Sequence, residues 1–418
     1  MYVPVISLRY LRRKKWGLQS IIGITIGVAT LIVVVSIMRG FDSELKSRIR
    51  GTLSHITIHK GGAFFPNNYV ELIKEIESLP HVEACAPYIE TPAFVKIRKN
   101  KRFVVLKGIK PHNESLVGNL QEYTSNCGST INDLSKLHGA KNNYSVLCGI
   151  ELLRIGSGEP ETFPNNFINK GEKLVVFCIK DWGKMSVLPF IINGMFKTNM
   201  QEYDDNYIYV PLEAAQKLVG KAHAINGISV KLDNYDYANK LKKIIQNILG
   251  YEYFVNTWED TRRSLLRTLV LERKIMGIIL FLIIIMAGFS INSLLSRIIR
   301  EKSRDIGILK SLGASNLSLF FIFLSIGIFI GSVGSILGLA VSILFLHYIN
   351  LILSYFGKLP ILEFLSPENL YFESLPVSFN LESIIIIIIS TILCSIVFSL
   401  LPAVAASRMN PVDLLRHE

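Results

Sequence analysis

None of the common catalytic motifs occurs in this sequence of 418 residues. There is no GxxxxGK[ST] loop, so the chain does not bind ATP through a Walker motif. There is also no HExxH, no GxSxG and no cysteine/histidine spacing typical of zinc. We therefore expect no catalytic residue, no metal and no cofactor of its own. What remains is a protein whose work is conformational and driven from elsewhere.

Cysteine is scarce, at five residues, and no pair has CxxC spacing: Cys85, Cys127, Cys148, Cys178 and Cys394. The spacing leaves two interpretations open, small buried hydrophobic residues or a single disulfide. His55 and His59 would share one face of an alternating strand. That allows a metal pair, but two polar residues on a solvated strand face are far commoner.

Long apolar segments make up much of the chain, which is 50% hydrophobic. Four of them reach the roughly 18 uncharged apolar residues that a membrane-spanning helix needs. Their interiors hold no Asp, Glu, Lys or Arg, which argues against an ion pump or a proton-coupled transporter. We predict membrane spans at 18–39, 272–296, 317–349 and 384–405.

Basic residues flanking these segments set the orientation. Lysine and arginine cluster in 1–17, 297–316 and 406–418, so the positive-inside rule places both termini and this loop in the cytoplasm. Residues 1–17 also suit an amphipathic segment on the inner membrane surface. The 40–271 and 350–383 segments then face outward. The predicted fold is a membrane protein with four transmembrane α-helices and a large α+β outer domain inserted between helices 1 and 2. The net charge of +12 is mostly this topology signal, and nucleic acid is not needed to explain it.

The outer domain reads as an alternation of strands and helices. Each end resembles a βαβ unit, and the part between them is mostly β. From Trp258 to about Arg300 there is no proline, so one helix could run from the outer domain through the membrane. We expect helices at 69–79 and 235–249, loops over 111–170, and strands at 55–59, 93–97, 103–106, 173–179, 189–196, 207–210, 225–232 and 251–256.

The cytoplasmic loop contains a short amphipathic helix. Ile306, Leu309 and Leu312 form an apolar stripe with Ile308 beside it, and Gly313 ends the helix. The polar flank is Glu301, Arg304 and Asp305. Such a helix needs a partner surface. Alternatively, it lies on the membrane or packs on its own spans.

Several motifs together resemble the FtsX-like permease superfamily, the type VII or mechanotransmission ABC transporter subunits. Others resemble its lipoprotein-releasing branch, the LolC/LolE type. The segments that carry the first resemblance are Phe289–Ser293, Glu301–Ser315 and Leu401–Arg416. Those that carry the second are Leu8–Leu11, Met38–Leu45, Arg48–Gly51, Gly194–Phe196 and Glu202–Asp204.

The resemblance implies partners. A separate LolD-like ATPase subunit would bind ATP and receive the loop helix at Glu301, Arg304, Asp305, Ile306, Leu309 and Leu312. A second permease subunit would complete a homo- or heterodimer. Lipoprotein substrates would pass from the inner membrane of a Gram-negative bacterium to a LolA-like periplasmic carrier, with the large domain in the periplasm. Carrier contact would fall on a hook hairpin, for which the candidates are Lys180, Trp182, Met185 and Pro189.

Small residues in the first span suggest close helix contacts or a lipid path. Gly23 and Gly27 are four residues apart, and Met38 and Phe41 follow near the outer boundary. Packing within the chain and packing across a dimer both remain open.

Two other functions also remain: an FtsX-like regulator of a periplasmic cell-wall hydrolase and a MacB-like efflux permease. The large outer domain counts against the first, and the missing Walker motif counts against the second.

Overall fold

The computed structural model describes residues 15–61, 64–65, 68–135, 143–154, 168–180, 184–356 and 374–410. Contacts divide the chain into two compact units. The membrane unit comprises Met1–Glu44 and Arg267–Glu418, and the outer unit comprises Leu45–Leu266. Most of the predicted N-terminal amphipathic segment, the end of the tail and half of the 350–383 loop lie outside the described residues.

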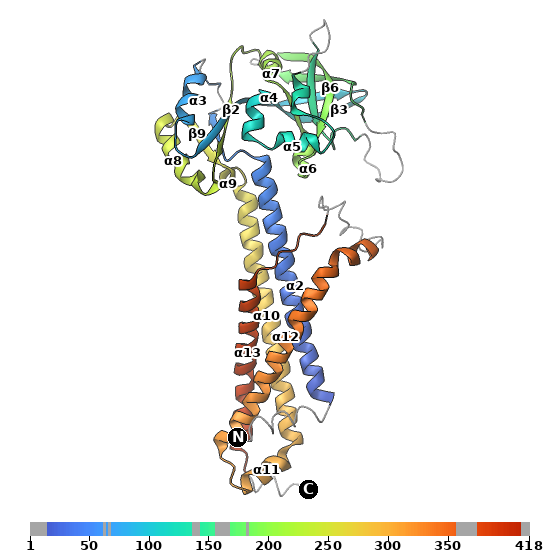
Figure 1. The fold of residues 1–418 in the computed structure, drawn as a ribbon, viewed down its shortest axis with the longest axis vertical. Helices are drawn as coiled ribbons and strands as arrows, with labels where there is room; N and C mark the ends of the chain where they lie inside the picture. Colours follow the sequence, from blue (N-terminus) through green and yellow to red (C-terminus); the bar gives the residue numbers. More distant parts are fainter. Residues whose placement is uncertain are drawn as a thin grey trace. The chain divides into compact units, whose positions relative to one another are not determined.

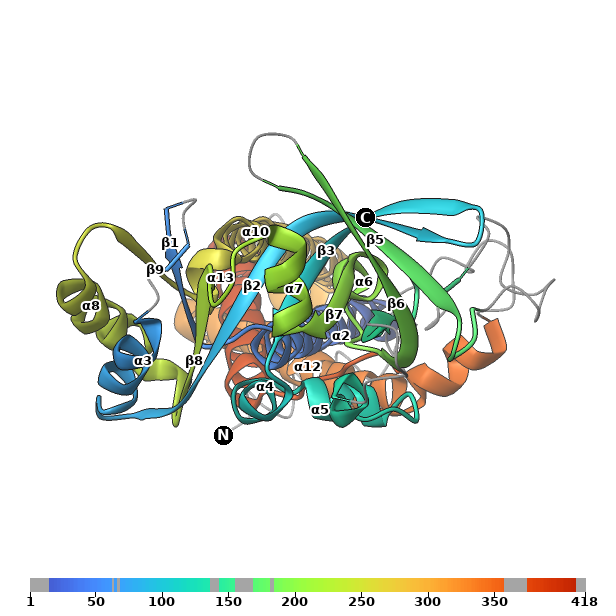
Figure 2. The ribbon, with the colours of Figure 1, turned by 90° about the horizontal axis from the view of Figure 1, so that it is seen from above.

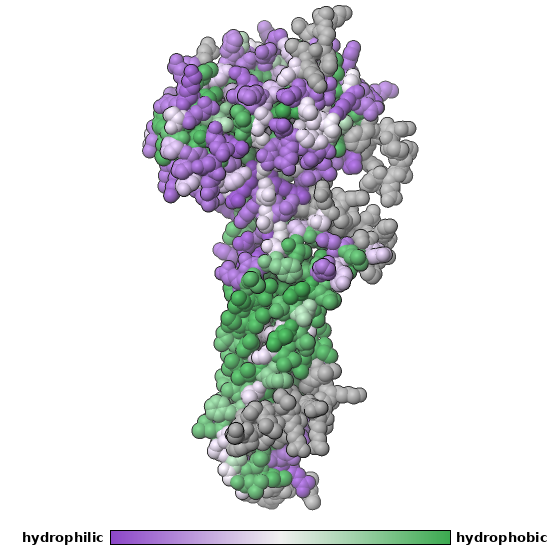
Figure 3. All heavy atoms as spheres, in the orientation of Figure 1, coloured by the Kyte–Doolittle hydropathy of each residue, from purple (hydrophilic) through white to green (hydrophobic). Residues whose placement is uncertain are grey.

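The membrane unit is built from long helices (Figure 1). They are α2 (Lys15–Thr52), α10 (Arg263–Glu301), α12 (Asn316–Phe356) and α13 (Leu381–Arg408), with the short α11 (Ser303–Ser311) between α10 and α12. The four long helices are long and apolar enough to cross a membrane, as predicted. Their outer surface is largely hydrophobic, whereas the surface of the outer unit is largely polar (Figure 3).

Two helices have boundaries that the sequence did not indicate. Helix α2 continues beyond the predicted span to Thr52, because the polar residues that follow the apolar segment still favour a helix. The helix expected from Trp258 onward is interrupted at Arg262, which separates α9 (Trp258–Thr261) from α10. A capping box between Thr257 and Asp260 fixes the start of α9.

Close packing in the membrane unit depends on small residues. A side chain at Gly327 would overlap Ser399, and one at Gly331 would overlap Ser395, so α12 and α13 touch through glycine and serine. Helix α12 meets α2 in the same way. There, a side chain at Gly334 would press on Ile24, and one at Gly338 would press on Val28.

The outer unit contains a nine-stranded sheet in the order β3-β7-β4-β6-β5-β2-β8-β1-β9. Because β3 also pairs with β2, the first six of these strands close into a barrel (Figure 2). Its interior holds aliphatic side chains such as Leu106, Val146, Val176 and Ile192. The strands are β1 (Ile56–Lys60), β2 (Val82–Ile97), β3 (Asn100–Ile109), β4 (Tyr144–Gly149), β5 (Lys173–Ile179), β6 (Met185–Phe196), β7 (Tyr207–Pro211), β8 (Gly227–Leu232) and β9 (Tyr253–Thr257).

The βαβ units predicted at the two ends of the outer domain are interleaved. Helix α3 (Tyr69–Glu77) connects β1 to β2, and α8 (Ala238–Leu249) connects β8 to β9. Each pair of strands is parallel but separated by a strand of the other pair, in the order β2-β8-β1-β9. This split arrangement follows from pairing distant parts of the chain, which local patterns do not report.

The prediction of loops over 111–170 was wrong. This part contains α4 (Pro111–Val117), α5 (Leu120–Ser125), the 3₁₀ turn η1 (Ile131–Leu134) and β4. Every residue of β4 is buried, because β4 lies between β6 and β7. The residues around β4 in the sequence are polar, so the local pattern did not indicate a strand, and β4 depends on its partners in the barrel.

All five cysteines are free, so the disulfide alternative finds no support.

Candidate functional site

The loop helix α11 lies against its own membrane unit along one face. Ile306 is completely buried in the core of that unit, and the half-buried Leu309 packs on the same core. Lys310 donates through Nζ to the carbonyl oxygens of Ser407 (2.7 Å) and Met409 (2.6 Å). This cation caps carbonyls at the end of α13, where the negative end of the helix dipole favours it. Helix α11 is therefore held in one orientation.

The exposed face of α11 differs from the predicted docking stripe. Ile306 faces inward, so the prediction that it contacts a partner is wrong, and Leu309 is only partly accessible. Arg304 and Ile308 are exposed, and Leu312 is 80% exposed. These three residues are four positions apart and form one apolar face with a cation at its start. The sequence had set Ile308 beside the stripe, although it belongs to the exposed face.

The two acidic candidates near α11 have partners within the chain. Glu301 lies 3.8 Å from Arg297 one turn earlier. The Asp305 carboxylate accepts from Lys302 Nζ at 2.9 Å. Gly313, at φ +94°, ends the helix as predicted, with Ala314 N donating to Leu309 O.

The predicted hook corresponds to the end of the β5–β6 hairpin, where Lys180 N donates to Lys184 O. Met185 is 64% exposed, and Pro189 is also exposed. The side chain of Lys180 instead lies over Gly220. Trp182 lies outside the described residues. Two of the four candidates therefore present their side chains on the hairpin surface.

An apolar row crosses four neighbouring strands on the outside of the barrel. Phe103 of β3 pairs with Phe94 of β2, Phe94 pairs with Phe177 of β5, and Phe177 pairs with Val187 of β6. Directly paired residues project on the same side of a sheet, so these four side chains form one cross-strand row. We call it the phenylalanine row. Phe94 and Phe103 are 48% and 54% exposed and meet edge to face, with ring centroids 5.5 Å apart.

Apolar residues lie beside the phenylalanine row on one side, and lysines lie beside it on the other. Ile179 pairs with Met185 at the hairpin end, and each is 64% exposed. The next row toward the other end of the strands contains Lys101, Lys96 and Pro189. A single-sided apolar surface with a basic border is typical of a protein interaction site. The register that aligns the phenylalanines could not be read from the sequence, because it depends on how the strands pair.

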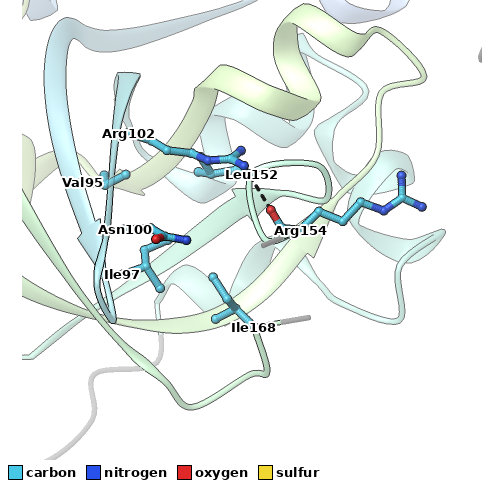
Figure 4. A pocket seen from close by; sticks show the side chains of 7 residues that line it. All are labelled: Val95, Ile97, Asn100, Arg102, Leu152, Arg154 and Ile168. Atoms are coloured by element: carbon cyan, nitrogen blue, oxygen red, sulfur yellow. Dashed lines mark hydrogen bonds between the residues drawn. The ribbon is translucent and has the colours of Figure 1, made fainter. Parts of the chain in front are cut away.

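A shallow pocket lies on the inner side of the β2–β3 hairpin (Figure 4). Val95, Ile97, Leu152 and Ile168 line its floor. Arg102 is hydrogen-bonded within the chain, since its Nη2 donates to the carbonyl oxygen of Arg154 at 3.1 Å. Arg154 also lines the pocket and pairs with Glu151 at 3.1 Å, so both guanidinium groups have partners within the chain.

The outer end of the first span is crossed by the segment that leads into α13. Ser378 N donates to Ser36 O at 3.1 Å, and a side chain at Gly40 would overlap the backbone of Pro376. Asp42 forms an ion pair with Arg273 of α10. Met38 is half-buried and Phe41 is 37% exposed, so both are partly accessible beside this crossing.

Gly23 and Gly27 do not take part in packing within the described chain. A side chain added at either position would meet no atom within 4 Å among the described residues, in contrast to Gly327 and Gly331. Ile22 and Ile26 beside them are 49% and 61% exposed. The intrachain interpretation of this pair of glycines is therefore wrong for the described residues.

The two strand histidines have different environments. His55 is buried, stacks on Tyr235 and accepts from Leu232 N through Nδ1 at 3.1 Å. Burial lowers the pKa of His55 to about 4. His59 Nε2 lies 3.2 Å from the Tyr88 hydroxyl. Among the described residues no group of three potential metal ligands occurs.

Two family descriptions match this chain and together cover both units. Residues 18–248, more than half of the chain, match the family described as MacB-like periplasmic core domain. Residues 277–411 match the family described as FtsX-like permease C-terminal.

Similar proteins match almost from end to end. The lipoprotein-releasing system transmembrane protein LolC of Neisseria meningitidis serogroup B is 28% identical, over 99% of this chain and 98% of the relative. LolC of Xylella fastidiosa is 26% identical over 99% and 98%. LolE of Haemophilus influenzae is 25% identical over 95% and 93%. The periplasmic region of MacB from Actinobacillus actinomycetemcomitans is 14% identical and covers 53% of this chain and 97% of that chain, but its TM-score of 0.32 is too low to support the fold.

The two family matches follow one another along the chain, with the periplasmic core domain before the permease C-terminal domain. The first match includes α2 and most of the outer unit, and the second includes α11, α12 and α13. The chain thus belongs to the family with a MacB-like periplasmic core domain, carries an FtsX-like permease C-terminal domain, and is a permease of the LolC/LolE type.

Proposed function

We propose that this chain is the membrane-spanning subunit of an ABC transporter that releases lipoproteins from the inner membrane of a Gram-negative bacterium. The observation that carries the proposal is the end-to-end similarity to transmembrane proteins of lipoprotein-releasing systems. Both the outer unit and the membrane unit take part in that similarity, so it does not rest on a shared module alone.

The energy source is a separate ATPase subunit. This chain has no Walker motif, and α11 presents an apolar face that the described residues of its own membrane unit leave uncovered. Ile308 and Leu312 would enter a groove of the ATPase, and Arg304 would lie at its edge. Motion of α11 would be passed to α10, which is continuous from Arg263 to Glu301, or roughly 60 Å at 1.5 Å per residue.

A second permease subunit would cover the open face of α2. Gly23 and Gly27 permit a close approach of another helix, and the neighbouring isoleucines supply apolar contact. Before release, the acyl chains of a lipoprotein would contact this same uncharged face and the accessible Met38 and Phe41. A lipid substrate needs no polar group there.

A LolA-like carrier would bind the phenylalanine row together with the hairpin residues Met185 and Pro189. The exposed rings supply the apolar centre, and Lys96 and Lys101 supply a basic border. A carrier with an apolar surface and an acidic border would be complementary to it.

Depletion of the protein followed by fractionation of the membranes tests the function itself. We expect outer-membrane lipoproteins to accumulate in the inner membrane. Normal sorting after depletion would overturn the proposal. Co-purification with an activator of cell-wall hydrolases, with sorting intact, would instead favour the FtsX-like regulatory function.

A charge on the exposed face of α11 tests the ATPase contact. Leu312→Glu should reduce stimulation of ATP hydrolysis in the reconstituted complex about tenfold or more, because a carboxylate would be buried at the interface. Leu312→Met is the matched control. Leu309→Glu is less informative, since Leu309 also packs on the core of the membrane unit. Unchanged stimulation by Leu312→Glu would refute the docking role.

A further inference from the structure

The end of α2 and the beginning of α10 hold the same short turn of the outer unit. This turn, Thr198–Asp204, follows β6 and includes the beginning of α6 (Gln201–Asn206). Arg48 in the last turns of α2 donates through Nη1 to Asn199 O at 2.7 Å. Arg262, directly before α10, contacts Glu202 at 2.8 Å and donates through Nη2 to the Tyr203 hydroxyl at 3.2 Å.

The turn is fixed to the barrel by buried polar contacts. Asp204 is completely buried, and its Oδ1 accepts from Thr198 N (2.7 Å) and Thr198 Oγ1 (2.9 Å). Leu152 N, just beyond β4, donates to Asp204 O at 3.1 Å. A side chain at Gly149 of β4 would overlap the backbone of Asp204, so the turn lies directly on the strand. Displacing the turn would therefore disturb β4 and the barrel.

A second contact ties the end of α2 to α9, the short helix before α10. The Arg50 guanidinium lies over the rings of Tyr235 (5.0 Å) and Trp258 (4.7 Å), and Trp258 begins α9. Such cation–π contacts add to the hydrophobic packing of the rings. Ile49 between these two arginines is completely buried. Arg48 and Arg50 thus contact different parts of the outer unit from the same turn of α2.

We propose that the Thr198–Asp204 turn is a transmission joint, where α2 and α10 act on the barrel together through Arg48 and Arg262. The proposal rests on the proposed function, because it assigns a mechanical role within lipoprotein release. Motion of either helix reaches the barrel through this one turn, which Arg48 contacts at a backbone carbonyl and Arg262 at two side chains. The contact of Arg50 with Trp258 also joins the end of α2 to α9. Arg48 and Arg262 are positioning residues.

Hydrogen exchange in the full chain, assembled with its ATPase in lipid nanodiscs, tests the joint directly. Arg48→Ala and Arg262→Ala should each speed exchange of the turn amides about tenfold, since each loses a charge-assisted hydrogen bond. The double variant should exchange little faster than either single variant, because the turn is already released. Arg263→Ala, at an exposed neighbouring position, is the control and should exchange like wild type. Additive effects would show two independent anchors and overturn the joint.

Transport measured in the same samples separates this proposal from the proposed function. With the joint disrupted, ATP hydrolysis should stay near the wild-type rate, while lipoprotein release falls about tenfold or more. Release at the wild-type rate by the double variant would overturn the joint and leave the function intact. If wild-type complex releases no lipoprotein but the exchange effects remain non-additive, the function fails and the joint stands as a structural element.

Discussion

The membrane unit and the outer unit pack their interiors with different side chains. In the membrane unit, α12 and α13 approach each other through glycines set against serines, such as Gly331 and Ser395. In the outer unit, large aliphatic side chains fill a closed barrel, and a buried ion pair joins Lys107 to Glu114 at 3.0 Å. In lipid, burying apolar side chains brings little gain, so close backbone contact stabilises the helices. In water, the burial of apolar side chains supplies most of the favourable free energy of folding. It can therefore offset the cost of burying the Lys107–Glu114 ion pair.

The buried ion pair of the outer unit should give the largest stability effect. Burial alone would lower the pKa of Lys107, but Glu114, Tyr88 and Glu90 together outweigh it and raise that pKa, so Lys107 is charged at neutral pH. Lys107→Met should destabilise the sheet by about 3–5 kcal/mol, because it leaves a carboxylate buried without a partner. Hydrogen exchange of β2 and β3 amides in the full chain would measure this loss.

An exposed ion pair supplies the control for that substitution. Arg98 and Glu172 lie at the surface, and Arg98→Met should cost less than about 1 kcal/mol. Equal effects of Lys107→Met and Arg98→Met would mean that burial does not distinguish the two pairs.

A larger side chain at a packed glycine tests the membrane unit. Gly331→Leu should destabilise the helices by about 1–3 kcal/mol or more, because the added atoms overlap Ser395. Gly27→Leu, at an uncovered position of α2, should leave the isolated chain near wild type. Thermal unfolding in detergent would compare them. If both unfold alike, glycine contact is not what stabilises this unit.

Two groups, His55 and Asp204, change the stability of the outer unit with pH in opposite directions. Burial lowers the pKa of His55 to about 4, so stability due to His55 is complete above pH 6.5 and is lost as the pH falls toward 4. Burial raises the pKa of Asp204 from 3.8 to about 6, so stability due to Asp204 is complete below pH 3.8 and is lost as the pH rises toward 6. Each slope is at most about 1.4 kcal/mol per pH unit.

Variants that remove one group at a time would reveal these slopes. With His55→Gln, stability of the outer unit should fall as the pH rises from about 4 to 6. With Asp204→Asn, stability should rise from pH 4 to 6.5. Denaturant unfolding of the outer unit in the full chain, followed by hydrogen exchange, would show the opposite signs. Slopes of the same sign in both variants would contradict this assignment.

The phenylalanine row should give the smallest stability effect. Phe103→Ser changes a half-exposed side chain, so we expect stability to change by no more than about 0.5 kcal/mol. Affinity for the carrier should nevertheless fall about tenfold, because aromatic residues dominate the centres of interfaces. Phe254→Ser, at an exposed position on β9, is the control, and binding measurements would compare the two. Equal affinity of both variants for the carrier would remove the row from the proposed surface.

Fold prediction succeeded where one local signal was enough. Long uncharged segments placed the four helices, and Gly313 placed the end of α11, because both follow from residues close in the sequence. Strand β4 was not predicted, and the strand order of the two βαβ units was not predicted either. Each depends on partners far along the chain.

The accessibility of the candidate site residues depends on distant contacts in the same way. The amphipathic pattern of α11 was correct, but Ile306 lies inside the membrane unit and Ile308 outside, since the pattern does not say which of two apolar edges meets the chain itself. Arg48 and Arg262 are 214 positions apart, and no pattern linked them to one turn.

By itself the sequence determined that this protein has four apolar helices, a large domain between the first two, and no Walker motif of its own. Composition and local spacing decide these features, because membrane insertion depends on the hydrophobicity of continuous segments. Only the tertiary structure decided which side of α11 is exposed, how four strands align the phenylalanine row, and that α2 and α10 hold one turn. Those features depend on strand register and on side-chain contacts between residues far apart in the chain, which the order of residues alone does not reveal.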